Sequence, residues 1–466
     1  MSARQISAQE ITERVLELSR ADGCVVITEE RSGVNLRWAG NALTTNGVTR
    51  DRSVTVIATV RGATGTASGV VSRTAVSAAD LAGLVQDAEA AARAAGPAED
   101  AHPLVTGVPP APDFAEPPAE TSPAVFDAFA PALGEAFARA RSAGRQLYGF
   151  AQHRMVTSYL ATSTGLRLRH DQPTGHVELN AKTPAGGSSW LSRATAGFTD
   201  ADPLALDAEL AERLAWSAER IELPAGRYET LLPPTALADL LVYQQWRASA
   251  RDATEGRSVF SHPGGGTRVG EKLARLPLTL RSDPAAPGLE CAPFVLTHSS
   301  DEGRSVFDNG LPLKATDWIR EGVLEHLLTS RHTAGTTGLP LTPYTDNLIL
   351  DAGGTASTAE LIAASGHDRP VLLLTSLWYI REVDPASLLL TGLTRDGVLL
   401  VRDGRVVGEV NNFRFNESPV SLLARATEAG RTERTVPRDC GKYFNRAAMP
   451  MLRIPDFHMS SVSKGV

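Results

Sequence analysis

The chain has few cysteines, no long apolar run and no excess of positive charge. Its three cysteines, Cys24, Cys291 and Cys440, are widely separated and odd in number, which excludes a disulfide framework and a Cys-x-x-Cys zinc knuckle. No stretch approaches the roughly 18 apolar residues that span a bilayer, and the first ten residues lack the pattern of a signal peptide. A net charge of −7 gives no field that attracts nucleic acid. We therefore expect a cytoplasmic protein without a membrane or nucleic-acid partner.

The composition that is present is that of an ordinary folded protein. Of 466 residues, 42% are hydrophobic and 21% are charged. This length is enough for two or three domains, each with its own core. An amphipathic helix pattern over 7–20, an alternating strand pattern over 53–61 and an Ala-rich helical stretch over 77–95 predict a first α+β unit over 1–96.

Proline content marks the next boundary. Residues 97–123 contain eight prolines, which neither a helix nor a central strand accommodates, so they are predicted to form an extended linker. A second α+β unit is predicted over 124–222, and a β-rich C-terminal domain over 223–466. The predicted fold class is therefore α+β, with two N-terminal α/β sub-domains followed by a β-rich C-terminal domain.

The C-terminal part gives several local predictions. Apolar residues at helical spacing after two prolines predict a helix over Ala236–Ala250. Short apolar runs predict strands at Phe294–Thr297 and Leu348–Leu350, and a short helix is predicted at Ala359–Ala364. Asp403-Gly404 between two apolar runs predicts a hairpin turn.

Motifs for metal or phosphate chemistry are weak. His170 and His176, with Glu178 nearby, suggest a metal patch, but isolated loop histidines are far commoner than ligands. The His176-Val-Glu178 order occurs in zinc deaminases, yet the chain has no Pro-Cys-x-x-Cys. The glycine-rich stretch 264–272 lacks the Gly-Lys-Ser/Thr of a phosphate loop, so a flexible loop is the favoured interpretation.

Several segments, taken in order and spacing, resemble one known family. Asp308–Leu327 is similar to the Gly-x-Pro…Gly-Val-Leu segment of the TldD/PmbA (TldD/TldE) metallopeptidases, long labelled modulators of DNA gyrase. Asp384–Gly397 and Asn411–Asn416 resemble the closing block of that family. Arg50–Gly69 looks like part of its first domain, and Pro224–Tyr228 resembles the opening of its third.

One motif of that family is missing. Where the metallopeptidases carry His-Glu-x-x-x-His, the matching segment here reads Val242-Tyr-Gln-Gln-Trp-Arg-Ala-Ser-Ala-Arg251. Histidine and glutamate hold zinc and activate its bound water, which glutamine, tryptophan and arginine cannot do. The resemblance implies a heterodimer in which TldD carries the zinc motif and TldE (PmbA) lacks it and helps to enclose the peptide-binding space. By this criterion the chain falls on the TldE side.

The resemblance thus predicts a non-catalytic TldE/PmbA-like subunit of a zinc metallopeptidase that degrades unstructured polypeptides or processes precursor peptides. A TldD-like paralogue would supply the zinc, and no cofactor is expected in this chain. Trp246, Arg247 and Arg251 stand on the face that binds metal in the family. They are candidates to line a shared cavity, where the arginines would hold a peptide carboxylate. The favoured alternative is that the tryptophan packs in the core and the arginines are solvated or paired.

Cys440 can be interpreted in several ways, and these lead to alternative functions. Arg438-Asp-Cys440-Gly-Lys442 resembles the C-terminal Cys-Gly-Lys of TldD, whose cysteine joins the zinc site. One thiolate is a single ligand where zinc needs three or four, so Cys440 is interpreted as a vestigial metal ligand or a structural residue. A self-sufficient hydrolase of small amides or peptides would instead use Cys440 as a nucleophile, with its pKa lowered by Arg438 and Lys442. A regulatory binding protein is the third hypothesis, and the acidic net charge argues against direct DNA contact.

Overall fold

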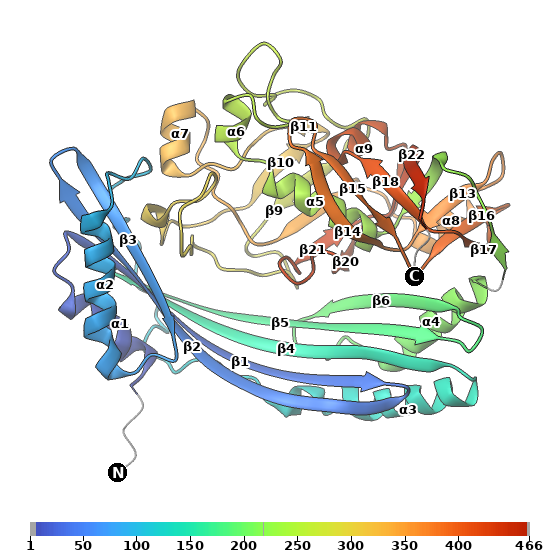
Figure 1. The fold of residues 1–466 in the computed structure, drawn as a ribbon, viewed down its shortest axis with the longest axis horizontal. Coiled ribbons are helices and arrows are strands. Elements are labelled where there is room, and N and C mark those ends of the chain that lie inside the picture. Colours follow the sequence, from blue (N-terminus) through green and yellow to red (C-terminus); the bar gives the residue numbers. More distant parts are fainter. Residues whose placement is uncertain (1–5, 218, 464–466) are drawn as a thin grey trace.

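The computed structural model describes residues 6–217 and 219–463. A long curved sheet forms one half of the molecule and a β-rich part forms the other, facing it (Figure 1). The predicted α+β fold class is confirmed, because helices and strands are mixed throughout and strands dominate the second half of the chain. Within the described ranges, no helix combines the length and apolarity needed to cross a membrane.

The curved sheet has six antiparallel strands in the order β3-β2-β1-β4-β5-β6. They are β1 (Gly23–Ala39), β2 (Ala42–Gly62), β3 (Gly65–Thr74), β4 (Gln146–Thr162), β5 (Arg167–Lys182) and β6 (Ser188–Thr195). Successive side chains of a strand point to opposite faces, so the alternation along β5 gives the sheet one apolar and one polar face. Since β1 pairs with β4, the predicted units 1–96 and 124–222 share one sheet.

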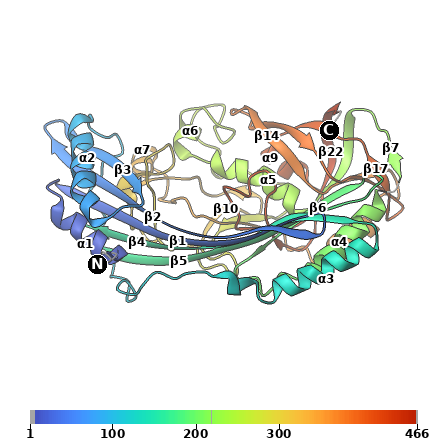
Figure 2. The same ribbon diagram turned by 60° about the horizontal axis from the view of Figure 1, so that its bottom comes forward.

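Helices cover the outer, apolar face of this sheet at its two ends (Figure 2). They are α1 (Ala8–Leu18), α2 (Leu81–Ala94), α3 (Phe129–Ser142) and α4 (Pro203–Trp216), with the 3-10 turns η1 (Ala78–Asp80) and η2 (Pro123–Phe126). Val26 of β1 packs with α1 and α2, whereas Trp38 of β1 and Leu179 of β5 pack with α3 and α4. This helix layer fixes the outer face and leaves the concave face free for a site.

The proline-rich segment lies against the sheet. Residues 97–122 contain no helix or strand, as the prolines predict. Their backbone is nevertheless held: the Tyr159 hydroxyl donates to the Glu116 carbonyl over 2.8 Å, and the Thr121 N–H donates to the Ser32 hydroxyl over 2.9 Å. The segment is therefore an irregular cover of the sheet that connects its two halves.

The β-rich part contains two sheets, with strand orders β11-β10-β9-β12-β21-β20 and β14-β15-β18-β22-β8-β13-β16-β17-β7 and with β19 paired to β22. The strands are β7 (Arg220–Ile221), β8 (Gly226–Leu232), β9 (Thr279–Ser282), β10 (Thr316–Arg320), β11 (Val323–Leu324), β12 (Leu348–Asp351), β13 (Val371–Leu374), β14 (Leu377–Asp384), β15 (Leu389–Thr394), β16 (Val398–Arg402), β17 (Arg405–Val410), β18 (Phe413–Glu417), β19 (Glu428–Ala429), β20 (Glu433–Thr435), β21 (Ala447–Met449) and β22 (Leu452–Val462). The helices are α5 (Pro234–Trp246), α6 (Ala250–Thr254), α7 (Arg331–Thr337), α8 (Thr358–Ala363) and α9 (Pro419–Arg425), with the 3-10 turn η3 (Val306–Asp308).

Helix α5 is the central element of the β-rich part. Nearly all of its side chains from Ala236 to Gln245 are buried, which is the environment of a core helix rather than a surface helix. The predicted helix Ala236–Ala250 is wrong beyond Trp246. The Ser249 hydroxyl accepts the N–H of Asp252 and so caps the separate helix α6, which breaks the helical run.

Candidate functional site

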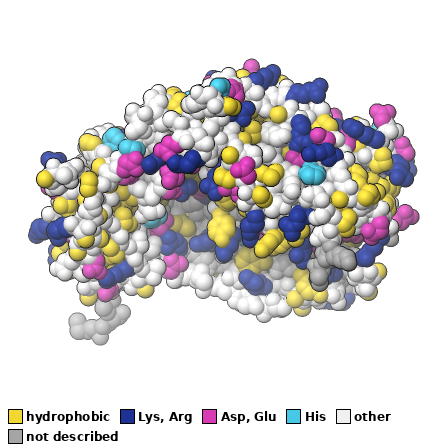
Figure 3. Space-filling view, turned by 45° about the horizontal axis from the view of Figure 1, so that its top comes forward, with side chains coloured by type: hydrophobic (Ala, Val, Ile, Leu, Met, Phe, Trp, Pro, Cys, Tyr) yellow, Lys and Arg dark blue, Asp and Glu magenta, His cyan; other side chains and the backbone are white. Residues whose placement is uncertain are grey.

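A cavity of about 1130 Å³ separates the concave face of the sheet from the β-rich part. It is lined on one side by β1, β4 and β5 and on the other by loops of the β-rich part, above all the segment Val436–Arg446. The space-filling view shows the surface hollowed between the two parts, with basic and hydrophobic side chains around the hollow (Figure 3). We call the sheet side the floor and the loop side the roof.

The floor is built by strand periodicity. Every second residue from Phe150 to Ser158 of β4 and from His170 to Glu178 of β5 lines the cavity, and most of these side chains are polar. The antiparallel register places Gln152 opposite His176 and Arg154 opposite Thr174. Residues of intervening parity, such as Leu179, are buried against α3 and α4. The polar groups of the floor therefore stand on a rigid, packed layer.

The two histidines of β5 lie on this floor, on one face of the strand. Burial lowers the pKa of both His170 and His176, opposed for His176 by the charge of Glu178. The His176 ring lies 5.6 Å from the Phe150 ring, and its Nε2 lies 3.9 Å from a Glu178 carboxylate oxygen. Across the described residues, no three His, Cys, Asp or Glu side chains form a group that could hold a metal ion.

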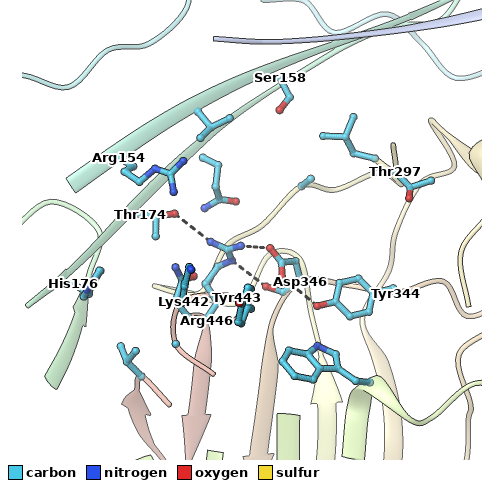
Figure 4. Close-up of a pocket in the computed structure, with 18 of the residues that line it drawn as sticks. Arg154, Ser158, Thr174, His176, Thr297, Tyr344, Asp346, Lys442, Tyr443 and Arg446 are labelled. Carbon is cyan, nitrogen blue, oxygen red and sulfur yellow. Dashed lines mark hydrogen bonds and ion pairs between the residues drawn. The ribbon is translucent and has the colours of Figure 1, made fainter. Parts of the chain in front are cut away.

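Arg446 joins the roof to the floor (Figure 4). Its Nη1 donates to the hydroxyl of Thr174 on β5 over 3.2 Å, and its Nε donates to the Asp346 carbonyl over 3.0 Å. Its Nη2 forms an ion pair with the Asp346 carboxylate, which also accepts from the Tyr344 hydroxyl over 3.3 Å. The C-terminal segment is thus tied to both walls of the cavity.

Behind the roof, α5 meets the Cys440 segment through Asp239. One carboxylate oxygen of Asp239 accepts the backbone N–H groups of Asp439 and Cys440 over 2.8 and 3.1 Å, and the other accepts that of Arg438 over 3.0 Å. The side chain is fully buried. Burial raises its pKa to about 8, although the three amide hydrogen bonds act in the opposite direction. Asp239 is therefore a clamp between α5 and this segment.

Cys440 lies beside this clamp with 2% of its surface exposed. Burial, together with the nearby carboxyls of Asp239 and Asp439, raises the pKa of the Cys440 thiol, and a hydrogen bond with Tyr243 only partly offsets this. The Tyr243 hydroxyl itself donates to the Ile380 carbonyl over 3.0 Å. Zinc binds a thiolate together with other deprotonated donors. A neutral thiol, and a buried carboxyl group whose oxygens already accept three amides, do not fit zinc.

Of the three cavity candidates proposed from the sequence, Trp246, Arg247 and Arg251, only the tryptophan lines the cavity. Trp246 lines the cavity, with its ring 5.4 Å from that of Tyr243. Arg247 pairs with Glu382 over 2.6 Å, and Arg251 pairs with Glu99 over 3.0 Å outside the cavity lining. The segment aligned with the zinc motif spans the end of α5. Tyr243 within it contacts Cys440, as does Asp239, which lies before the segment.

Arg438 does not face the thiol that it was suggested to activate. Its guanidinium stacks between the Trp190 ring, 4.6 Å away on β6, and the Trp378 ring, 5.4 Å away on β14. It donates to the Ser376 hydroxyl over 2.7 Å and pairs with Asp396 over 2.5 Å. Its charge is therefore neutralised away from Cys440.

Sequence reasoning missed Asp239, Asp346 and Arg446. A signal for Asp239 exists, because it is the single ionisable residue between Pro234 and Val242 in an otherwise apolar helix. Carboxylates are almost never fully buried unless paired, so such an aspartate indicates a specific partner. The pairing of Arg446 with Asp346 has no local signal, since the two residues are far apart in the chain.

The family models define the class: the chain has the central and C-terminal domains of the PmbA/TldA metallopeptidases. The chain belongs to the PmbA/TldD family: the model of the PmbA/TldA metallopeptidase C-terminal domain matches residues 225–461, and that of the central domain matches residues 117–218. The predicted family is thereby confirmed. No curated protein sequence matches the chain.

Three solved structures are similar over almost their whole length. TldE from Thermococcus kodakarensis has 15% identity and a TM-score of 0.77, with 97% of this chain and 99% of that chain covered. A candidate modulator of a DNA gyrase from Thermotoga maritima has 16% identity and a TM-score of 0.75, with 97% and 99% covered. A candidate modulator of DNA gyrase from Bacteroides thetaiotaomicron has 15% identity and a TM-score of 0.72, with 98% of each chain covered. At these identities the likeness shows the shared fold alone.

Proposed function

We propose that the chain is the non-catalytic, TldE/PmbA-like subunit of a heterodimeric zinc metallopeptidase that acts on unstructured polypeptides or precursor peptides. The observation that carries this proposal is the junction of α5 with the Cys440 segment. A buried carboxyl group held by three backbone amides and a neutral thiol lie there, and the sequence contains no His-Glu-x-x-x-His motif. The partner would be a family member with His-Glu-x-x-x-His, whose zinc activates a water molecule for peptide hydrolysis.

The contribution of this chain would be one half of an enclosed space for peptides. Its cavity of about 1130 Å³ exceeds the roughly 300–1,000 Å³ of ordinary small-ligand sites, which suits a length of extended polypeptide. The floor is held by the helix layer, and Arg446 fixes the roof to it. A folded protein does not fit such a space, so the substrate must be unstructured.

Co-expression with a paralogue that carries His-Glu-x-x-x-His tests this function. We expect the isolated chain to contain no stoichiometric zinc and to cleave no peptide, and the mixture to contain zinc and to hydrolyse peptides in a chelator-sensitive way. Zinc content and peptidase activity are measured for each chain alone and for the pair. Stoichiometric zinc in the isolated chain, together with proteolysis that a chelator stops, would contradict the proposal.

Substitution of Cys440 by serine separates this function from a cysteine hydrolase. Because the thiol is buried and its pKa is raised, it is not poised as a nucleophile. We expect Cys440→Ser to leave the activity of the reconstituted pair unchanged, with a loss of about 1–3 kcal/mol of stability from the buried hydroxyl. Cys24→Ser is the matched control, since Cys24 is equally buried and its thiol pKa is likewise raised. Loss of turnover in Cys440→Ser alone would favour the hydrolase.

A further inference from the structure

The charged side chains that line the cavity are not evenly paired. Three of its carboxylates have arginine partners: Glu29 pairs with Arg31, Asp308 with Arg331, and Asp346 with Arg446. Asp439 accepts the backbone N–H groups of Tyr379 and Ile380 over 2.9 and 3.2 Å. Among the described residues, Glu178 comes within ion-pair distance only of the His176 ring, 3.9 Å away, whose pKa is lowered. Most of the carboxylates in the cavity are therefore already paired or hydrogen-bonded.

Four cations of the cavity lack such partners. Arg37, Arg154, Arg304 and Lys442 all line it, and within the ranges that the structure describes none of them forms an ion pair or a side-chain hydrogen bond. Unpaired cations within a hollow bounded by low-dielectric walls focus a positive field inside it. The cavity is thus locally basic, although the whole chain carries a net charge of −7.

Two of these cations belong to the floor. Arg154 stands opposite Gly33 on β1 and Thr174 on β5, so the strands beside it offer no carboxylate. Figure 4 shows its guanidinium reaching from the sheet into the space on the side of Lys442. Arg37 lies with its guanidinium carbon 4.7 Å from the centre of the Phe150 ring. A ring face attracts this cation but leaves its N–H groups free to donate.

The other two cations belong to the roof. The guanidinium carbon of Arg304 lies 4.0 Å from the centre of the Tyr344 ring, and the ammonium of Lys442 lies 5.5 Å from that of Tyr443. They come from separate segments, so the positive groups stand on both walls. A chain that threads between floor and roof meets cations on either side.

We propose that this cavity selects acidic polypeptides, whose Asp and Glu side chains and C-terminal carboxylate are held by Arg37, Arg154, Arg304 and Lys442. Arginine binds a carboxylate with two parallel N–H···O hydrogen bonds, and the lysine adds a mobile point charge. This inference rests on the proposed function and adds a substrate class to it. The aromatic rings beside three of the cations provide apolar contact for the residues between the acidic ones.

A nucleic acid is the other polyanion to consider, and the lining disfavours it. Five carboxylates also line the cavity: Glu29, Glu178, Asp308, Asp346 and Asp439. A continuous phosphate backbone would pass close to them, whereas a peptide bears negative charge only at some of its side chains. A mixed lining with an excess of free cations therefore fits an acidic peptide.

Peptide binding to the isolated chain tests the proposal. The probe is a fluorescent, flexible Gly/Ser peptide that carries several glutamates, and its reference has glutamine at the same positions. At low ionic strength we expect the glutamate peptide to bind about tenfold more tightly, because each exposed charge pair contributes up to about fivefold in affinity. Added salt should remove most of the difference, since it screens these charges.

Variants locate the effect in the cavity. Arg154→Gln and Arg37→Gln are each expected to weaken binding of the glutamate peptide about threefold to fivefold and to leave the glutamine peptide unaffected. Arg405→Gln is the matched control, because Arg405 is exposed on β17, lies outside the cavity lining and forms no ion pair with any described residue. All three positions are exposed, so the variants should melt like the parent, which circular dichroism checks.

Three results would overturn the proposal: no binding of the glutamate peptide at low salt, equal affinity for the two peptides, or the same loss in Arg405→Gln as in Arg154→Gln. A single-stranded oligonucleotide of equal charge that binds more tightly than the peptide would also overturn it, in favour of nucleic acid. The assay needs neither zinc nor a partner. The binding result is therefore independent of reconstitution of the peptidase, so a failure of the acidic-peptide proposal can be distinguished from a failure of the proposed function.

Discussion

Replacement of Asp239 by alanine is expected to destabilise the β-rich part by about 3–5 kcal/mol, because each buried donor left without an acceptor costs about 1–3 kcal/mol. Three backbone N–H groups, those of Arg438, Asp439 and Cys440, lose their acceptor in this variant. The site is closed to water, so solvent cannot replace the carboxylate. Urea unfolding followed by tryptophan fluorescence measures the change, and Trp378 lies close to the affected segment.

Asp384→Ala is the matched control for this prediction. Asp384 also accepts two backbone N–H groups, those of Ala386 and Ser387, but at an exposed turn. Water can satisfy those donors after truncation, so the loss should be far smaller than in Asp239→Ala. Equal losses in the two variants would show that burial of the carboxylate is unimportant and would contradict the clamp.

The same carboxyl makes stability depend on pH. The pKa of Asp239 is raised to about 8 in the folded chain, whereas an unfolded aspartate titrates near about 3.9. Between these values the folded chain retains a proton that the unfolded chain has released, so this group stabilises the fold less as pH rises through the window. Asp239→Asn cannot titrate, and its unfolding free energy should fall less between pH about 5 and about 8 than that of the parent.

Local sequence patterns predicted local structure well. The hairpin expected at Asp403-Gly404 joins β16 to β17, and both residues have positive φ, as a tight turn between twisted strands requires. The short helix expected at Ala359–Ala364 is α8, which begins one residue earlier, after the Ser357 cap. These features depend on neighbouring residues alone, so the sequence contains their cause.

Predictions that depend on distant partners were less successful. The strand expected at Phe294–Thr297 is wrong, because apart from one isolated bridge these residues are in irregular backbone. The apolar side chain of Phe294 packs against the curved sheet instead of belonging to a strand. The motif comparison singled out Val242–Arg251, which includes Tyr243 at the Cys440 contact but not Asp239. Which turn of a helix meets a loop about two hundred residues later is set by packing, and no local pattern encodes it.

The basic character of the cavity could be predicted from the sequence only in part. Alternation along β4 and β5 shows which residues share a face, so Arg154 could be placed with its neighbours on the polar face from the sequence. That Arg154 remains without a carboxylate depends on the register, which sets Gly33 and Thr174 beside it. The family resemblance indicated Trp246 as a cavity residue, but only the three-dimensional arrangement reveals the excess of cations.

Phe307→Ala is expected to lower the free energy of unfolding by about 3–5 kcal/mol, the usual cost of removing a fully buried phenylalanine side chain. Phe307 is 1% exposed and belongs to the cluster in which Ile27 and Leu160 of the curved sheet meet the β-rich part. Its loss therefore weakens the seam between the two cavity walls rather than either wall alone. We expect faster proteolysis within residues 97–122, which cover the sheet beside this seam, and weaker binding of the acidic peptide.

Leu341→Ala is the control for the seam, because Leu341 is 43% exposed and its truncation should cost little. The polar bridges between the walls, Arg446 with Thr174 and Arg434 with Asp200, remain intact in both variants. If Phe307→Ala resists proteolysis and binds peptide like Leu341→Ala, these bridges hold the walls by themselves. If it loses both properties, apolar burial is the force that keeps the cavity closed, as the small net contribution of exposed ion pairs leads us to expect.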